Sequence, residues 1–225
     1  MDHLNSFPIH LKNNSIYITA TEEKLKAFSR RPDIKCKPSA SAVKDHVVIV
    51  GGYVPRSCFS QKFIICRLTN SFGIYSGSGA IGAIESLREK GFKGLITCIS
   101  KEPHLPIDRT KLSKALITDV SKIQWRDAQY FEDAGVTFKL NTIVSEVDFA
   151  GKRVRIEGGE EVSYTKLILA TGGTPKRLPM EGFELGNVFT LRGIDDAKAI
   201  VEAVGETNDK KIVVIGSSFI GKYCI

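Results

Sequence analysis

The sequence has few cysteines, and they form no recognisable metal or disulfide pattern. The five cysteines form no Cys-x-x-Cys pair and show no zinc-type spacing. An odd number of cysteines without a pattern is typical of free thiols in a reducing compartment. We therefore expect no metal site in this chain. The cysteines are Cys36, Cys58, Cys66, Cys98 and Cys224.

Long apolar runs and a secretory signal are also missing. No stretch approaches the ~20 apolar residues that a membrane span needs, and Met1–Leu4 lacks the basic start and apolar stretch of a signal peptide. We expect no membrane span and a soluble, cytoplasmic protein. A mitochondrial location is the alternative if a targeting segment once preceded Met1.

Charge is modest and evenly spread. The 225 residues carry a formal net charge of +7, with 42% hydrophobic and 25% charged residues, which suits one large or two small globular domains. A basic balance fits either nucleic acid or a cofactor that carries phosphates. Because Lys and Arg are scattered rather than clustered, we expect no nucleic-acid partner.

Strand and helix patterns alternate from Val47 onward, which predicts an α/β fold with a parallel sheet. Three short pieces around a Gly158-Gly159 turn predict a small antiparallel sheet within it. The predicted strands of the main sheet are 47–50, 95–99, 136–140, 166–170 and 212–215. The predicted helices are 80–90, 125–134 and 195–204, and the antiparallel pieces are 144–147, 153–156 and 161–163.

The first 45 residues differ from the rest. Residues 7–19 alternate as in strands around Asn13-Asn14, which predicts a β hairpin. Residues 22–45 are polar and basic, as in a linker, with a short helix expected near Glu22–Phe28. We divide the chain into a hairpin unit (1–21), this linker (22–45), a main domain (46–200) and the start of a further domain (201–225).

A dinucleotide-binding fingerprint opens the first predicted helix of the main domain. Gly77, Gly79 and Gly82 give G-x-G-x-x-G, with Ser78 and Ala80 between them. Such glycines allow a tight turn, close approach of amides to a pyrophosphate, and close contact between helix and strand. Glu102 ends the next strand, where an acid that binds ribose is expected. The alternative is a glycine-rich turn in another kind of α/β protein.

Residues 53–76 separate this fingerprint from the strand that should feed it. Gly52-Tyr53-Val54 can be encoded with a fungal-type intron donor, and Tyr75-Ser76 with an acceptor. Excision would give VVIVGGGSGAIGA, in which Gly51, Gly77 and Ala80 fit the variant G-x-G-x-x-A. We hypothesise retained introns here and after Gly221; a family-specific loop is the alternative.

Four segments together resemble the FAD-dependent pyridine nucleotide–disulfide oxidoreductase superfamily, in its ferredoxin/rubredoxin reductase and apoptosis-inducing-factor-like branch. KEPHLPIDRTKLSK (101–114) follows the pattern E-P-x-x-P-Y-x-R-P-x-L-S-K, with Ile107 and Thr110 as departures. Ser218 departs from the family's second glycine in the last segment. The other three segments are LILATGG (167–173), VFTLRGIDDA (188–197) and IVVIGSSFIG (212–221).

The resemblance implies a Rossmann-like FAD-binding domain of three layers (ββα/α) with a small antiparallel β insertion, preceded by a short β hairpin. It also implies that residues 201–225 are the truncated start of an NAD(P)-binding domain. Arg109 and Arg192 are fixed cations suited to a pyrophosphate; the alternative for each is a solvated surface charge.

The remaining site residues follow from the same motifs. Lys114 would lie by the flavin ring as the catalytic cation, and Val144 would line the adenine pocket. The residues implied to bind FAD are Gly51, Gly77, Ser78, Gly79, Ala80, Gly82, Glu102, Arg109, Lys114, Val144, Ala170, Thr171, Gly172 and Arg192; those implied for NAD(P)H are Gly216 and Gly221.

The N-terminal segment LNSFPIHLKNNSIYITA resembles the last hairpin of a Rieske ferredoxin domain. A Rieske cluster needs two Cys and two His, and no such pairs occur here. We therefore expect no iron–sulfur cluster in this chain, and any ligand-bearing part to lie upstream of Met1.

The expected function is hydride transfer from NAD(P)H to FAD, followed by electron transfer to an acceptor such as a ferredoxin or a Rieske-type domain. One alternative is a truncated, catalytically inactive FAD-binding fragment. Another is a simple NAD-binding dehydrogenase, which the 101–114 motif disfavours. The oligomeric state stays open.

Overall fold

The computed structural model describes residues 9–12, 15–18, 34–39, 41, 44–51, 77–206 and 210–216. The chain divides into two compact units, residues 1–33 and 34–225. In the first unit, β1 (Ile9–Lys12) and β2 (Ser15–Ile18) pair antiparallel, with Ile9 opposite Ile18. The predicted hairpin is thus confirmed. The helix expected near 22–28 lies outside the described residues.

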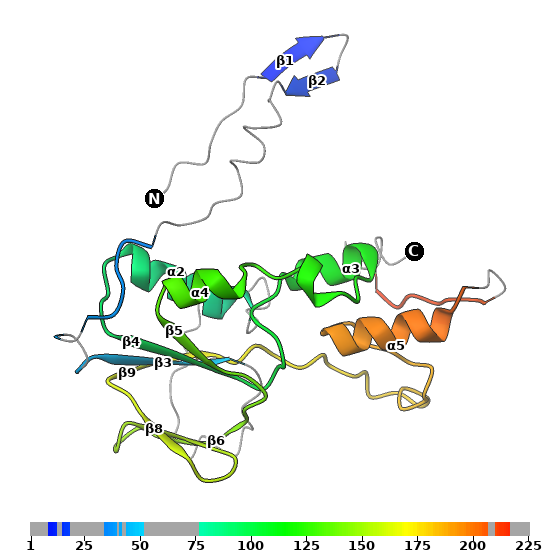
Figure 1. Ribbon diagram of the computed structural model, residues 1–225. Coiled ribbons are helices and arrows are strands. Elements are labelled where there is room, and N and C mark those ends of the chain that lie inside the picture. Colours follow the sequence, from blue (N-terminus) through cyan, green and yellow to red (C-terminus); the bar gives the residue numbers. More distant parts are fainter. Residues whose placement is uncertain are drawn as a thin grey trace. The chain divides into compact units, whose positions relative to one another are not determined.

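The second unit is built on a parallel sheet of four strands in the order β5-β4-β3-β9 (Figure 1). The chain moves outward from β3 to β5 on one side and returns to the other side of β3 as β9. These strands are rich in Val and Ile because both faces of the sheet are covered. Their bounds are β3 (His46–Gly51), β4 (Leu95–Ser100), β5 (Val136–Lys139) and β9 (Lys166–Ala170).

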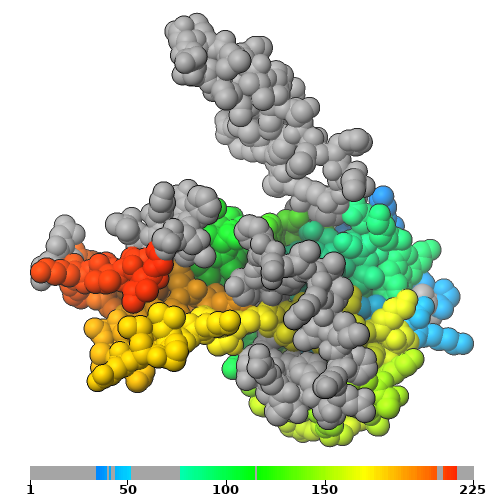
Figure 2. Space-filling view, turned by 180° about the vertical axis from the view of Figure 1, so that it is seen from behind, coloured from blue at the N-terminus to red at the C-terminus, as the bar shows by residue number. Residues whose placement is uncertain are grey.

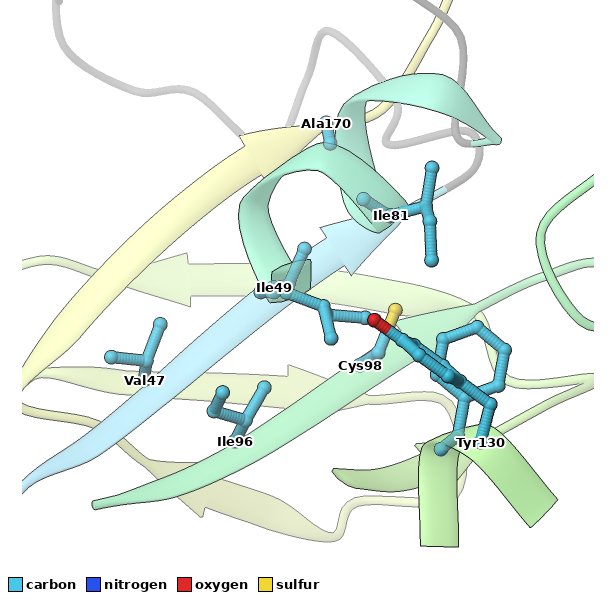
Figure 3. Close-up of a cluster of buried hydrophobic side chains, with 10 residues drawn as sticks. Val47, Ile49, Ile81, Ile96, Cys98, Tyr130 and Ala170 are labelled. Atoms are coloured by element: carbon cyan, nitrogen blue, oxygen red, sulfur yellow. The ribbon is translucent and has the colours of Figure 1, made fainter. Parts of the chain in front are cut away.

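Helices α2 (Ser78–Glu89) and α4 (Ala128–Asp133) cover one face of this sheet. Val47 and Ile49 of β3 pack on Ile81 from α2, together with residues of β4 and α4 (Figure 3). The helix predicted from residue 125 begins at 128 because the Asp127 side chain accepts a 2.8 Å hydrogen bond from the Tyr130 amide and so caps it.

An antiparallel sheet in the order β6-β7-β8 covers the other face. Val48 and Val50 of β3 point to this side and pack against Val144 and Val154. The alternation along β3 therefore joins two cores, and the predicted three-layer architecture is confirmed. The strands are β6 (Val144–Asp148), β7 (Arg153–Ile156) and β8 (Glu161–Ser163).

A third core lies where the segment after β4 meets α5 (Ile194–Val204). Ile107, Leu112 and Ile123 pack there with Ile194 and Ala197. The short helices of this segment were not predicted from the sequence. They are the 3-10 helix η3 (Arg109–Lys111), α3 (Leu112–Ala115) and the 3-10 helix η4 (Val120–Lys122).

The strand predicted at 212–215 is wrong for this chain. Residues 211–216 form no strand, and in the described part of the chain they pair with none. Val213 is 85% exposed and Ile215 69% exposed. Figures 1 and 2 show this segment, in red, near α5 at one end of the unit. Strand-type composition alone is not enough where the described sheet offers no neighbour.

Part of the predicted linker packs on the second unit. Ile34 contacts the core beneath α2 and α4. The Ser39 amide donates a 3.1 Å hydrogen bond to the Lys93 carbonyl, and Cys36 Sγ donates to the Phe92 carbonyl at 3.1 Å. Residues 34–39 are therefore a segment packed against the second unit and part of it. Within the described residues, no helix is long and apolar enough to cross a membrane.

The buried thiol of Cys98 on β4 leads us to expect that the free energy of unfolding depends on pH. Its side chain is 2% exposed, and burial raises the pKa of the thiol from 9.0 to about 12. The folded state therefore holds this proton more tightly than the unfolded state, so the free energy of unfolding should fall as the pH rises above 9. Urea unfolding at pH 8 and pH 10 measures this fall. It should be smaller in Cys98→Ala; an equal fall in both proteins contradicts the prediction.

Candidate functional site: a dinucleotide crevice

The carboxyl ends of three parallel strands lie side by side. Gly51, the last residue of β3, is opposite Ser100 of β4 on one side and Ala170 of β9 on the other. The chain leaves β3 toward β4 and comes back on the far side as β9, so the direction of connection reverses at β3. In open α/β sheets, ligands bind outside the carboxyl ends of the strands at such a switch point.

Helix α2 begins at this edge of the sheet. Ile81 in its first turn and Ala170 at the end of β9 belong to one core cluster and lie near each other in Figure 3. Gly77 is the N-cap, no side chain among the described residues caps the helix, and its first turn holds no acid. The amides of such a turn and the positive end of the helix dipole are suited to bind an anion.

The packing of α2 distinguishes the two possible fingerprints, G-x-G-x-x-G ending at Gly82 and the variant G-x-G-x-x-A ending at Ala80. Gly77 is buried against the next loop, and a Cβ there would stand 2.3 Å from the Ile107 carbonyl oxygen. Ala80 is fully buried in the core with Ile49. Gly82 is exposed, and among the described residues no atom lies within 4 Å of a Cβ built on it. The expected close helix–strand contact at Gly82 is therefore wrong, and the packing fits the variant with Ala80 as its third member.

Glu102 and Arg109, the acid and the cation that we expect beside the cofactor, form an ion pair with each other. The Glu102 carboxylate accepts a hydrogen bond from Arg109 Nη2 in an ion pair that is largely shielded from solvent. Arg109 Nη1 also donates to the Arg192 carbonyl oxygen at 3.1 Å. Arg109 is thus held in place from two directions and is not a solvated surface charge. Glu102, expected at a ribose, here contacts this guanidinium.

Arg192 stands at the start of α5. Its amide and that of Gly193 donate to Asp196 Oδ2, at 2.7 and 2.8 Å, which fixes the backbone at this turn. Burial lowers the pKa of the Arg192 side chain to about 10, opposed by the charge of Asp196. Desolvation disfavours this cation, and an anion bound nearby would stabilise it. A phosphate group would suit that position.

The other expected residues lie in different surroundings. Thr171 and Gly172 follow β9 and are half-buried, and Gly172 has a positive φ of 71°. Val144 is buried between the two sheets. Lys114 is exposed on α3. Of the second fingerprint, the structure describes Gly216, which lies in a segment (211–216) that pairs with no described strand, whereas Gly221 lies outside the described residues.

Two contacts at this site were not expected from the sequence. The first is the close approach of the Ile107 backbone to Gly77, since the sequence marked Ile107 only as a departure from the family pattern. Arg126 Nη2 lies 2.9 Å from Glu85 Oε1 on α2. Glu85 stands four residues after the buried Ile81, at the border of the buried face of α2, and no local signal assigns it a partner 41 residues later.

The arrangement fits a dinucleotide such as FAD on chemical grounds. A pyrophosphate needs amide donors and fixed cations. An uncapped helix N-terminus and two partly buried arginines supply them at the carboxyl edge of the sheet.

The profile of the family described as "Pyridine nucleotide-disulphide oxidoreductase" matches residues 74–224. The chain belongs to this family. It is 29% identical over 221 residues, 98% of its length, to "Apoptosis-inducing factor 3" of Homo sapiens. It is 36% identical over 149 residues, 65% of its length, to "Rubredoxin-NAD(+) reductase" of Pseudomonas putida.

Among solved structures, this family member is similar to the ferredoxin reductase for the CYP199A2 system of Rhodopseudomonas palustris. The TM-score is 0.63 at 27% identity, over 80% of this chain and 39% of that one. The complex of putidaredoxin reductase with putidaredoxin shares the fold, with a TM-score of 0.63 at 24% identity, over 81% of this chain and 39% of that one. The chain spans 33–38% of the length of the two curated relatives above.

Proposed function

We propose that this chain forms the FAD-binding portion of an NAD(P)H-dependent oxidoreductase that passes electrons to an iron–sulfur protein. The observation that carries the proposal is the start of α2 at the carboxyl edge of the sheet, where no described side chain caps the helix. Arg109 is held in the loop whose Ile107 carbonyl lies against Gly77. The names of the relatives support the reaction class, since several are reductases of rubredoxin or ferredoxin systems. The dehydrogenase alternative has no comparable support.

Bound FAD would supply a hydride acceptor that can release electrons singly. The protein's own contribution is binding and orientation. The first-turn amides of α2 would donate to the pyrophosphate, and Arg109 would offset its charge. Arg192 would act from the start of α5. Lys114, on exposed α3, would stabilise negative charge at the flavin ring by analogy with the family pattern.

A flavin titration tests the binding part of the proposal. The purified chain is titrated with FAD, and the quenching of flavin fluorescence is measured alongside the same titration with riboflavin. We expect saturable binding of FAD that excess ADP displaces, because the ADP half carries the pyrophosphate. Equal affinity for riboflavin, or no displacement by ADP, would contradict the proposed site.

A second candidate is a chain that binds FAD without oxidising NAD(P)H. The observation that favours it is the exposed, unpaired 212–215 segment, which offers no folded second dinucleotide site in the described residues. Reduction of ferricyanide by NADH separates the two candidates. FAD binding without ferricyanide reduction supports the second; turnover by these 225 residues alone supports the first and excludes the second.

We also propose that residues 53–76 are translated from a retained intron. The family match begins at residue 74, near the end of this segment, and so leaves out β3, although β3 belongs to the same sheet as the later strands. Alignment of transcripts with the gene tests this. We expect a spliced message that joins the Gly52 codon to the Gly77 codon; spliced transcripts that all keep these codons would refute it.

A further inference from the structure

We propose that Arg126 is a positioning residue for the cofactor site, and that its ion pair with Glu85 sets the position of Arg109 relative to the start of α2. This inference rests on the proposed FAD function. It concerns the segment between β4 and α4, which carries Glu102, Arg109 and Lys114. Arg126 contacts Glu85, Trp125 and Tyr130, which are not among the residues expected to bind the cofactor, so it would act through the segment.

The segment closes on itself as a short antiparallel ladder. The Asp108 amide donates to the Ile123 carbonyl at 2.7 Å, and the Trp125 amide donates to the Pro106 carbonyl at 3.0 Å. Ile107 and Gln124 form the bridge between these two bonds. Arg109 therefore follows directly after one edge of the ladder, and Arg126 directly after the other. A movement of the ladder carries both residues with it.

The ladder contacts α2 at two points. At the start of the helix, the Ile107 carbonyl lies so close to Gly77 that a Cβ there would stand 2.3 Å away. Two turns along, Arg126 Nη2 lies 2.9 Å from Glu85 Oε1, and both side chains are mostly buried, at 13% and 16% exposed. A contact at one point alone would allow the ladder to pivot, whereas two contacts fix its orientation on the helix.

Arg126 also has contacts other than Glu85. Its guanidinium lies 5.5 Å from the ring centroid of Tyr130, over the ring, and Tyr130 belongs to the core beneath α2. Its Nη1 donates to the Trp125 carbonyl at 2.7 Å. The cation thus connects the ladder, α4 and α2. An ion pair with little solvent access is screened weakly, so its loss should change the placement of the ladder rather than only a surface charge.

The test is a double-mutant cycle on FAD affinity. In wild type, Arg126→Met should raise the Kd for FAD about tenfold, the size expected for residues coupled in one network. In an Arg109→Met background, the same change should have little further effect, because the cation that Arg126 positions is gone. A purely structural role of Arg126 would instead lower affinity by the same factor in both backgrounds.

Three further variants complete the test. The swap Glu85→Arg with Arg126→Glu should recover most of the affinity, and Arg126→Lys should recover part of it. Arg153→Met, which removes an arginine paired with Asp148 and Glu161 on the antiparallel sheet, should leave the Kd unchanged. Thermal unfolding without FAD identifies any variant that fails to fold.

The outcomes separate this inference from the function on which it rests. If wild type does not bind FAD, the proposed function fails, and the inference with it. If wild type binds FAD and folded Arg126→Met binds it equally well, or if the effects of Arg109 and Arg126 are additive, the inference alone is overturned. The non-additive result with rescue by the swap supports it.

Discussion

Gly77→Ala is expected to destabilise the protein by about 2 kcal/mol and to weaken FAD binding at least about tenfold. The added Cβ would stand 2.3 Å from the Ile107 carbonyl oxygen, which no real Cβ contact allows. The neighbour is backbone, so it cannot turn away as a flexible side chain would. Relief requires the loop that carries Arg109 to move off the start of α2, where the pyrophosphate is expected.

Gly82→Ala is the matched control on the same helix. Gly82 is exposed, and among the described residues no atom lies within 4 Å of the new Cβ. Because alanine is more favourable than glycine in the interior of a helix, the free energy of unfolding of this variant should rise by about 0.5–1 kcal/mol. Urea unfolding and FAD titration measure both variants. A loss of stability in Gly82→Ala would restore the reading with Gly82 as the third glycine; an unaffected Gly77→Ala would contradict the close approach to Ile107.

Arg88→Met is expected to destabilise the protein by about 3–5 kcal/mol. Arg88 is 1% exposed near the end of α2, and its guanidinium is satisfied by backbone carbonyls. Nε donates to Ala134 at 2.6 Å, Nη1 to Phe92 and Gly94, and Nη2 to Gly135 at 3.1 Å. Burial lowers the pKa of this side chain. Methionine fills much of the space but leaves those acceptors without their donor.

The cost should appear in stability and not in cofactor affinity, because Arg88 lies at the opposite end of α2 from Gly77. Urea unfolding should report the loss, while the Kd for FAD of the folded protein should change less than twofold, a difference of about 0.4 kcal/mol. Arg153→Met, at an exposed ion pair, is the control and should alter stability little. Equal stability of Arg88→Met and wild type would show that the carbonyls find other donors.

The parallel sheet was largely predictable from the sequence. β3, β4 and β9 were found to within one residue, because buried parallel strands are short runs of Val, Ile and Leu between turn residues. The three antiparallel strands were found for a different reason, the alternation around Gly158-Gly159. Motifs rather than periodicity singled out Glu102 and Arg109, which the structure brings together in an ion pair.

The contacts that position the site could not be predicted in the same way. The ladder between Ile107 and Gln124 joins residues 17 positions apart, and neither segment has the length or alternation of a strand. Arg88 looks like an ordinary cation in the last turn of a helix. Nothing local shows that Gly94 and Gly135 bring carbonyls to it from two loops.

The most direct measurement is a crystal structure of this chain with FAD bound. Our account predicts the FAD pyrophosphate within hydrogen-bond distance, about 3 Å, of the first-turn amides of α2, with Arg109 beside it. A pyrophosphate bound away from the start of α2, or an adenine end that does not reach the carboxyl edge of β3 and β4, would contradict it.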